Sequence, residues 1–136
     1  MDWLYEGQTF KDWNSYYGFV YKITHVPTGK KYIGRKYFTL ASYKQVNGKR
    51  KKIRKESDWQ EYWGSSKHLQ SDITIYGKEQ FKREIIRLCK SRTECSYFET
   101  KAIFEEDALL SKEYYNAWVS CKITEMHIKS INKDVH

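Results

Sequence analysis

The sequence predicts a small α/β sandwich, in which a three-stranded antiparallel sheet is flanked by helices. Two strand-forming runs joined by a short turn predict a hairpin, a third β-branched run follows later, and helical segments lie on either side of that run. The chain has 136 residues, of which 40% are hydrophobic and 31% are charged. This length and composition suit one globular domain over residues 1–136, with a core at about 17–118.

The predicted hairpin occupies residues 17–37. Its first strand covers 17–25, where Val20 and Ile23 are β-branched and the neighbouring aromatic residues also favour strands. The run Pro-Thr-Gly that follows marks a turn, because proline pre-sets its own φ and glycine tolerates positive φ. Residues 31–37 form the returning strand, so the two strands are expected to pair antiparallel.

Helical structure is expected over 57–77. Ser57 could cap a first helix, and a second helix could begin at Ser65 or Ser66. Gly77 marks the expected end, since glycine is the preferred residue just past a helix.

The third strand is expected at Phe81–Cys89, and the longest helix at 91–110. Ser91 begins this helix, and Glu94 three residues later completes the pattern of a capping box. A short polar tail at about 123–136 follows the domain.

A basic insertion at about 38–55 separates the second strand from the first helical segment. Asn47-Gly48 is a strong hairpin-turn signal, so residues 42–53 are expected to form a hairpin or an ordered loop. The insertion could be a solvated charged loop or an arm that contacts phosphates. Its seven cations, with no acid among them, are Lys44, Lys49, Arg50, Lys51, Lys52, Arg54 and Lys55.

Composition excludes several classes of protein. No apolar run approaches the ~18 residues that a membrane span needs, and the N-terminus lacks the pattern of a signal peptide. Cys89, Cys95 and Cys121 are odd in number and widely spaced, which argues against a disulfide framework or a zinc clip and favours the cytoplasm. The formal charge of +8 favours a polyanionic partner, most often nucleic acid.

Two short runs on the predicted hairpin resemble the half-motifs of the GIY-YIG nuclease superfamily. They are Gly-Phe-Val-Tyr at 18–21 and Tyr-Ile-Gly at 32–34, with ten residues between the two motif tyrosines. Gly-Ser-Ser at 64–66, Tyr-Gly at 76–77 and Tyr-Asn at 115–116 follow in an order similar to phage-encoded homing endonucleases and Seg-like members. The resemblance implies an endonuclease that cuts double-stranded DNA with Mg²⁺ (or Mn²⁺) in the cytoplasm of a bacterial host.

The motif residues suit this chemistry. A tyrosine beside cationic side chains can have its phenolate form favoured, which makes Tyr21 the candidate general base. Tyr32 on the adjacent strand could hydrogen-bond the water, the metal shell or Tyr21. Gly34 leaves space where the substrate backbone could approach.

The resemblance places the metal-binding glutamate in the helix after the third strand, where Glu99 matches. One carboxylate with several waters is a common magnesium site. Four nearby acids compete for the role, namely Glu94, Glu105, Glu106 and Asp107. The resemblance also makes Asn116 a supporting hydrogen-bonding residue.

The catalytic arginine is the point at which the sequence departs from the family. Its usual place, eight or nine residues after the second glycine, holds serine and tyrosine here. Arg35 or Arg54 could clamp the scissile phosphate instead, with Lys36 adding charge. His25 and His68 are expected to be ordinary surface or hydrogen-bonded histidines.

Basic residues of the insertion are the candidate DNA contacts: Lys44, Lys49, Arg50, Lys51, Lys52 and Lys55. One site cuts one strand, so a double-strand break would need a homodimer or two sequential nicks. Because the usual arginine is absent, a non-catalytic nucleic-acid-binding module on the same scaffold is the alternative hypothesis.

Overall fold

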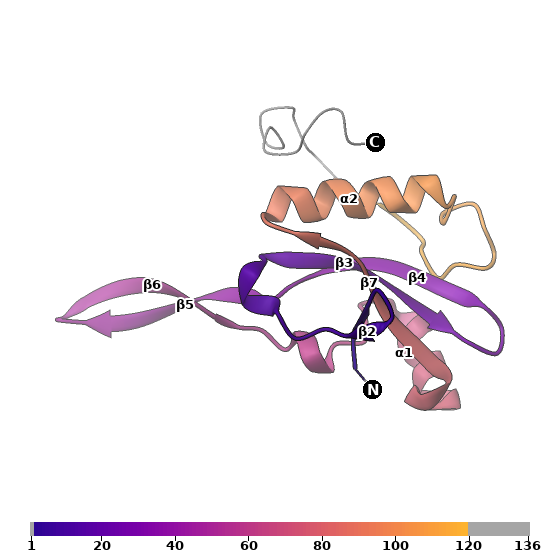
Figure 1. Ribbon diagram of the computed structural model, residues 1–136, viewed down its shortest axis with the longest axis horizontal. Coiled ribbons are helices and arrows are strands. Elements are labelled where there is room, and N and C mark those ends of the chain that lie inside the picture. The colour runs from indigo at the N-terminus through magenta and orange to yellow at the C-terminus, as the bar shows by residue number, and fades with distance from the viewer. Residues whose placement is uncertain (1, 120–136) are drawn as a thin grey trace.

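The central strand of the fold is β3 (Gly18–His25), which lies between β4 (Lys30–Tyr37) and β7 (Phe81–Cys89). A computed structural model describes residues 2–119 of the chain. Both neighbours run antiparallel to β3, as the sequence predicts. The three strands form the core of the sheet (Figure 1).

The sheet is larger than the predicted three strands. Two short strands extend it beyond β7, in the order β2-β1-β7-β3-β4, with β1 at Leu4–Tyr5 and β2 at Gln8–Thr9. β1 pairs parallel to β7, and β2 turns back on β1. Strands of two residues are too short to show alternation, so pattern reading does not detect them.

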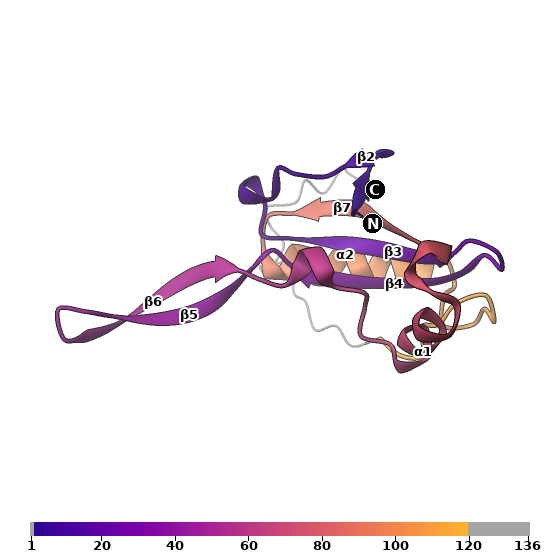
Figure 2. The ribbon, with the colours of Figure 1, turned by 90° about the horizontal axis from the view of Figure 1, so that it is seen from below.

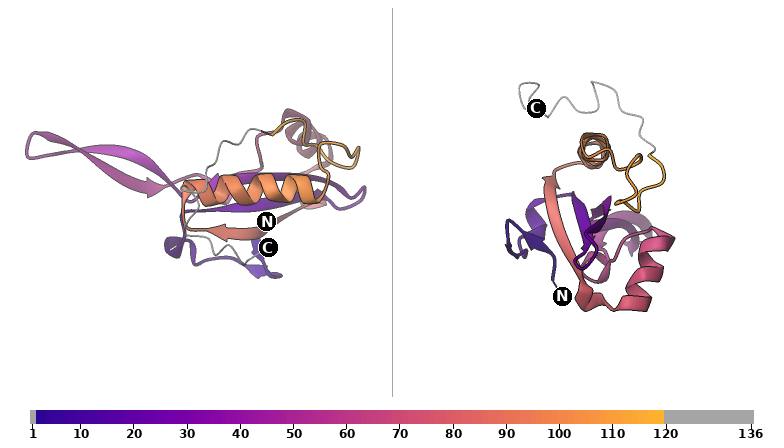
Figure 3. Two further views of the ribbon diagram at one scale, coloured as in Figure 1. Left: turned by 90° about the horizontal axis from the view of Figure 1, so that it is seen from above. Right: turned by 90° about the vertical axis from the view of Figure 1, so that its right-hand side faces the viewer.

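The two α-helices lie on opposite sides of the sheet, as Figures 1 and 3 show. α2 (Arg92–Glu105) packs Cys95 and Phe98 against Val20 and Ile33, whereas α1 (Lys67–Tyr76) packs on the opposite face. β3 is therefore buried on both faces. α2 ends at Glu105 instead of residue 110, and the expected cap is confirmed, because the Glu94 backbone N–H donates to Ser91 Oγ at 3.1 Å.

The prediction of helix over 57–77 is only partly right. Residues 59–61 form one 3₁₀ turn, and α1 begins after Ser66, which accepts a hydrogen bond from the Leu69 backbone N–H. Gly64, at φ 89°, interrupts the segment between them, because helical residues have negative φ. Gly77 ends α1 as predicted.

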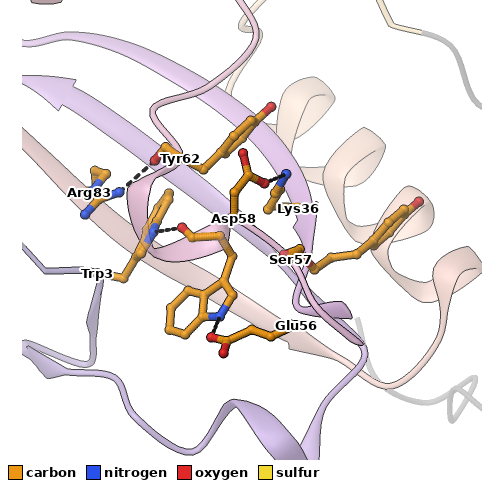
Figure 4. Close-up of polar contacts among 9 residues, drawn as sticks. Trp3, Lys36, Glu56, Ser57, Asp58, Tyr62 and Arg83 are labelled. Atoms are coloured by element: carbon orange, nitrogen blue, oxygen red, sulfur yellow. Dashed lines mark hydrogen bonds and ion pairs between the residues drawn. The ribbon is translucent and has the colours of Figure 1, made fainter. Parts of the chain in front are cut away.

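Ser57 does not cap a helix; its hydroxyl donates to the Tyr37 carbonyl at 2.6 Å. Further bonds fix the same segment, including Trp3 Nε1 to the Trp59 carbonyl and Arg83 to the Tyr62 carbonyl, both at 2.7 Å (Figure 4). The return from the basic insertion is thereby anchored to the domain.

The basic insertion is a two-stranded hairpin of β5 (Thr39–Val46) and β6 (Lys49–Glu56). Asn47 and Gly48 have φ values of 52° and 74°, which are typical of the tight turn that their sequence predicts. The hairpin is longer than the predicted 42–53 and extends away from the sheet along the direction of β4 (Figures 1 and 2).

The free edge of β4 is covered by the segment after α2. Lys31 donates its backbone N–H to the Glu113 carbonyl at 2.8 Å, and its carbonyl accepts from the Tyr115 N–H at 2.7 Å. This segment thus pairs with β4 over a single parallel bridge. The expected tail at 123–136 and Cys121 lie outside the described residues. Among residues 2–119, no helix has the length and apolar character needed to cross a membrane.

Candidate active site

A cavity of about 710 Å³ lies along the β4 edge of the sheet. Its walls come from β3, β4, the start of α1, α2 and the segment that covers β4. Of the predicted site residues, five line it: Tyr21, Tyr32, Arg35, Glu99 and Asn116. The fold thus gathers into one cavity residues that are up to 95 positions apart (116 − 21).

Arg35 and Glu99 form an ion pair inside this cavity. The distance from Arg35 Nη1 to Glu99 Oε1 is 2.6 Å, and the side chains are 31% and 15% exposed. Burial raises the pKa of the Glu99 carboxyl above its ordinary value, and Arg35 opposes part of that rise. Arg35 therefore holds a partly buried carboxylate in place while one side of its guanidinium remains accessible.

Tyr21 lies deeper than the sequence suggests. It is 1% exposed, and its ring packs against Trp3, Tyr32 and Tyr62 at centroid distances of 5.2–6.2 Å. Burial raises the pKa of Tyr21 well above its usual value, and Tyr62 adds to the rise. The expectation that cationic neighbours favour its phenolate is wrong for this structure, because desolvation dominates.

Tyr32 is the more accessible of the two motif tyrosines. Its hydroxyl lies 3.2 Å from Ser65 Oγ, at the start of the segment leading into α1. Burial raises the pKa of Tyr32, although the hydrogen bond with Ser65 opposes the shift. Its hydroxyl is thus placed to donate or accept a hydrogen bond at the cavity wall.

Gly34 makes room for Tyr21. A β-carbon at this position would lie 2.6 Å from Tyr21 Cζ and 3.0 Å from Tyr32 Cε2. The interpretation that Gly34 clears space for the substrate backbone is therefore wrong, because the Tyr21 ring fills that space.

Asn116 holds β4 from its outer edge. Its Oδ1 accepts from the Ile33 backbone N–H at 3.0 Å, and its Nδ2 donates to the Ile33 carbonyl at 2.8 Å. The amide side chain replaces the backbone of a further strand at this point. Since Ile33 is two residues from Arg35, Asn116 fixes the strand that carries the arginine.

Arg54 and Lys36 do not line the cavity. Arg54 lies at the base of the β5–β6 hairpin, where Nε and Nη2 donate to Thr39 and the guanidinium stacks on Tyr17. Lys36 lies on the face of β4 opposite to Arg35, and its Nζ is 2.6 Å from Asp58 Oδ1 (Figure 4). Of the two candidate arginines, the structure brings only Arg35 to Glu99.

The competing acids are engaged elsewhere. Glu106 binds Lys22 at 2.6 Å and accepts from the Tyr114 hydroxyl, and Glu105 lies 3.7 Å from Lys101. None of Glu94, Glu105, Glu106 and Asp107 lines the cavity.

Sequence reasoning missed three further residues of the cavity wall, namely Lys67, His68 and Trp118. His68 was expected to be an ordinary histidine, but it lies in the first turn of α1 at the cavity. Ser66, the cap of α1, was the available signal, because a helix that begins there places His68 in its first turn, close to Gly64. His25 is a hydrogen-bonded histidine, as expected, with Thr28 and Gln80 as its partners.

The donor set of the cavity fits a magnesium site with few protein ligands. Among residues 2–119, no cluster of three or more His, Cys, Asp or Glu side chains is present. Glu99 supplies one carboxylate, and Mg²⁺ commonly binds through one or two carboxylates and several waters. The cavity therefore combines a carboxylate, a guanidinium that suits phosphate and two tyrosine hydroxyls.

Comparisons with known proteins identify the family of this chain. The family model described as "Putative endonuclease segE, GIY-YIG domain" matches residues 3–119. The chain is 34% identical over 100 residues to "Putative endonuclease segE" of Enterobacteria phage T4. That alignment covers 74% of this chain but only 40% of the phage protein, and no solved structure matches. The chain therefore belongs to the SegE family of GIY-YIG domains.

Proposed function

We propose that this chain is the catalytic domain of a DNA endonuclease that hydrolyses phosphodiester bonds with Mg²⁺ or Mn²⁺. The observation that carries the proposal is the Arg35–Glu99 pair in the same cavity as both motif tyrosines. Hydrolysis of a phosphodiester needs a positive group on the phosphate, an activated water and stabilisation of the leaving oxygen. The cavity residues can supply or support each of these.

Arg35 is the proposed phosphate clamp. Its guanidinium has five donors, and the bond to Glu99 uses Nη1. The donors that bind neither Glu99 nor Tyr37 can bind a phosphate oxygen, while Glu99 keeps the plane of the guanidinium oriented. This geometry suits stabilisation of negative charge on the phosphate during attack.

Glu99 is the proposed metal ligand. A magnesium ion held there would polarise the phosphate and lower the pKa of a bound water. The carboxylate must be ionised for this role, and Arg35 favours that form against the opposing effect of burial.

The two tyrosines are proposed to position the attacking water in the neutral form of their hydroxyls. The attacking water loses a proton to bulk solvent and its oxygen forms a bond to phosphorus. The bond from phosphorus to the leaving oxygen breaks, and that oxygen takes up a proton from solvent. Tyr32, the more accessible of the two, contacts the water, and the Tyr21 hydroxyl helps to position it from deeper in the cavity. The raised pKa of Tyr21 keeps its hydroxyl neutral, so Tyr21 is not the general base in this proposal.

One such cavity cuts one strand, so a double-strand break is proposed to require a homodimer or two sequential nicks. The chain spans two fifths of the length of its phage relative. We propose a homing role, with a target sequence of its own, for the whole protein to which this chain belongs.

Nicking of supercoiled plasmid tests the proposal, with Mg²⁺, Mn²⁺ or EDTA. Glu99→Gln removes the charge but keeps the shape, and we expect it to reduce nicking by about 100-fold or more. Glu105→Gln is the matched control, because Glu105 is exposed on the same helix. We expect it to cut like the wild type.

Equal nicking by Glu99→Gln and the wild type would refute the metal-holding role. A wild-type protein that binds duplex DNA in a gel shift but cuts none with either metal would replace the endonuclease with a DNA-binding module.

A further inference from the structure

The β5–β6 hairpin carries positive charge that no ion pair among the described residues neutralises. Its strands hold the seven cations of the insertion, and none of the ion pairs found within residues 2–119 includes one of them. Lys44 and Lys51 even lie directly opposite each other, an arrangement that destabilises an isolated hairpin. Positive charge gathered in this way favours the binding of an anionic partner.

The strand register separates these cations onto two faces. Residues directly opposite each other share a face, and successive residues alternate between faces. The first face carries lysines beside small or apolar residues, with Lys44, Lys49, Lys51 and Lys55 as its cations. The second face carries the other three cations, Arg50, Lys52 and Arg54, beside Tyr43 and Gln45, with Glu56 at its base.

The second face has the side chains that distinguish bases. Arg50 and Gln45 lie directly opposite each other, and arginine and glutamine make two-pronged hydrogen bonds to guanine and adenine in the major groove. The Arg50 guanidinium also lies 3.9 Å from the centroid of the Tyr43 ring, which restrains its direction. A restrained guanidinium loses less conformational entropy on binding than a free one.

The dimensions of the hairpin fit the major groove. That groove is about 12 Å wide and 8.5 Å deep, and it admits a two-stranded ribbon. With one face on the groove floor, the opposite face lies at about the level of the phosphates, within reach of flexible lysines. The hairpin projects clear of the domain, so no other element within residues 2–119 blocks this approach (Figures 1 and 2).

We propose that the β5–β6 hairpin enters the major groove of the substrate duplex, with Arg50 and Gln45 reading base edges and the lysine face binding phosphates. The inference rests on the proposed function, because it takes duplex DNA as the substrate. It adds that this domain itself recognises a DNA sequence, close to the phosphodiester bond that it cuts.

The position of that sequence follows from the chain. Gln45 is ten residues after Arg35, so the two are at most about 33 Å apart at ~3.3 Å per residue. At ~3.4 Å per base pair, the bases read by the hairpin lie within about 10 base pairs of the nick.

Selection from a randomised 30-base-pair duplex library tests the base reading. The wild-type chain is expected to enrich a motif that contains a guanine. Arg50→Ala removes the guanidinium, and we expect it to lose about 5- to 150-fold of the preference for that guanine. Lys51→Gln is the matched control on the other face. We expect it to keep the motif and to reduce the slope of log K against log salt by about 0.9.

A second measurement identifies the groove. Replacing the selected guanine by 7-deazaguanine removes the N7 acceptor, which is exposed in the major groove. We expect this base to weaken binding by the wild type and to leave binding by Arg50→Ala unchanged. Thermal denaturation of each variant confirms that the domain is folded.

Three outcomes would overturn the inference: no enriched motif, the same loss of preference in both variants, or a motif unaffected by 7-deazaguanine. Nicking that depends on Glu99 would still support the proposed function in each case. Conversely, a motif read by Arg50 without any cleavage would refute the proposed function and leave the hairpin as a sequence reader.

Discussion

Asn116→Ala is the substitution whose effect follows most directly from the structure. It removes two hydrogen bonds, of 3.0 and 2.8 Å, to the backbone of Ile33, which is 0% exposed. A buried polar group left without a partner costs about 1–3 kcal/mol. Two such groups give about 2–6 kcal/mol, and water from the adjacent cavity can replace part of the loss. We therefore expect a loss of about 2–4 kcal/mol in the free energy of unfolding.

Urea unfolding measures this loss. The midpoint is expected to fall while the slope m stays the same, because the surface exposed on unfolding hardly changes. Asn14→Ala is the control, since Asn14 is exposed in a 3₁₀ turn, and a surface change of this kind stays within about 0.5 kcal/mol.

The same variant should also lose activity. Without Asn116, β4 loses its edge contacts at Ile33, and Arg35 on that strand is held less firmly relative to Glu99. We expect plasmid nicking to fall even without urea, where the variant is folded. A loss below about 1 kcal/mol together with unchanged nicking would refute this reasoning about the β4 edge.

Four further predictions concern the same cavity. Gly34→Ala places a methyl group against the Tyr21 ring, so we expect about 1–3 kcal/mol of destabilisation in urea unfolding, and a neutral result would contradict the packing argument. Tyr21→Phe removes only the hydroxyl, so we expect a folded protein by thermal denaturation with strongly reduced nicking, and wild-type nicking would remove Tyr21 from the mechanism. Because the pKa of Glu99 is raised, we expect nicking to fall on acidification at a higher pH than for an ordinary glutamate. The same shift makes the free energy of unfolding depend on pH, because the folded protein binds the Glu99 proton more tightly than the unfolded chain does. The contribution of Glu99 to stability is complete below its unfolded-state pKa and is lost as pH rises through its folded-state pKa. We expect Glu99→Gln to abolish this dependence in urea unfolding.

Local signals in the sequence determined the main elements. The strand pattern of β3 and β4, the Asn-Gly turn of the basic hairpin and the serine–glutamate cap of α2 all depend on residues close in the chain. Their physics is local, since φ preferences, capping bonds and alternation act over a few residues. The candidate residues Tyr21, Tyr32 and Glu99 were found in the same way, from a motif on one hairpin and a position on one helix.

Tertiary structure decided what those residues meet. No local rule could choose between Arg35 and Arg54, because the choice depends on the alternation of β4 against the position of α2. Burial of Tyr21 reversed the expected direction of its pKa, since desolvation depends on neighbours from distant parts of the chain, such as Trp3 and Tyr62. The role of Gly34 likewise depends on tertiary structure, because the Tyr21 ring from β3 fills the space beside it. The local conformation of the backbone depends on residues that are close in the sequence. The electrostatic environment and the packing of a side chain depend on all of its contacts, which only the folded chain defines.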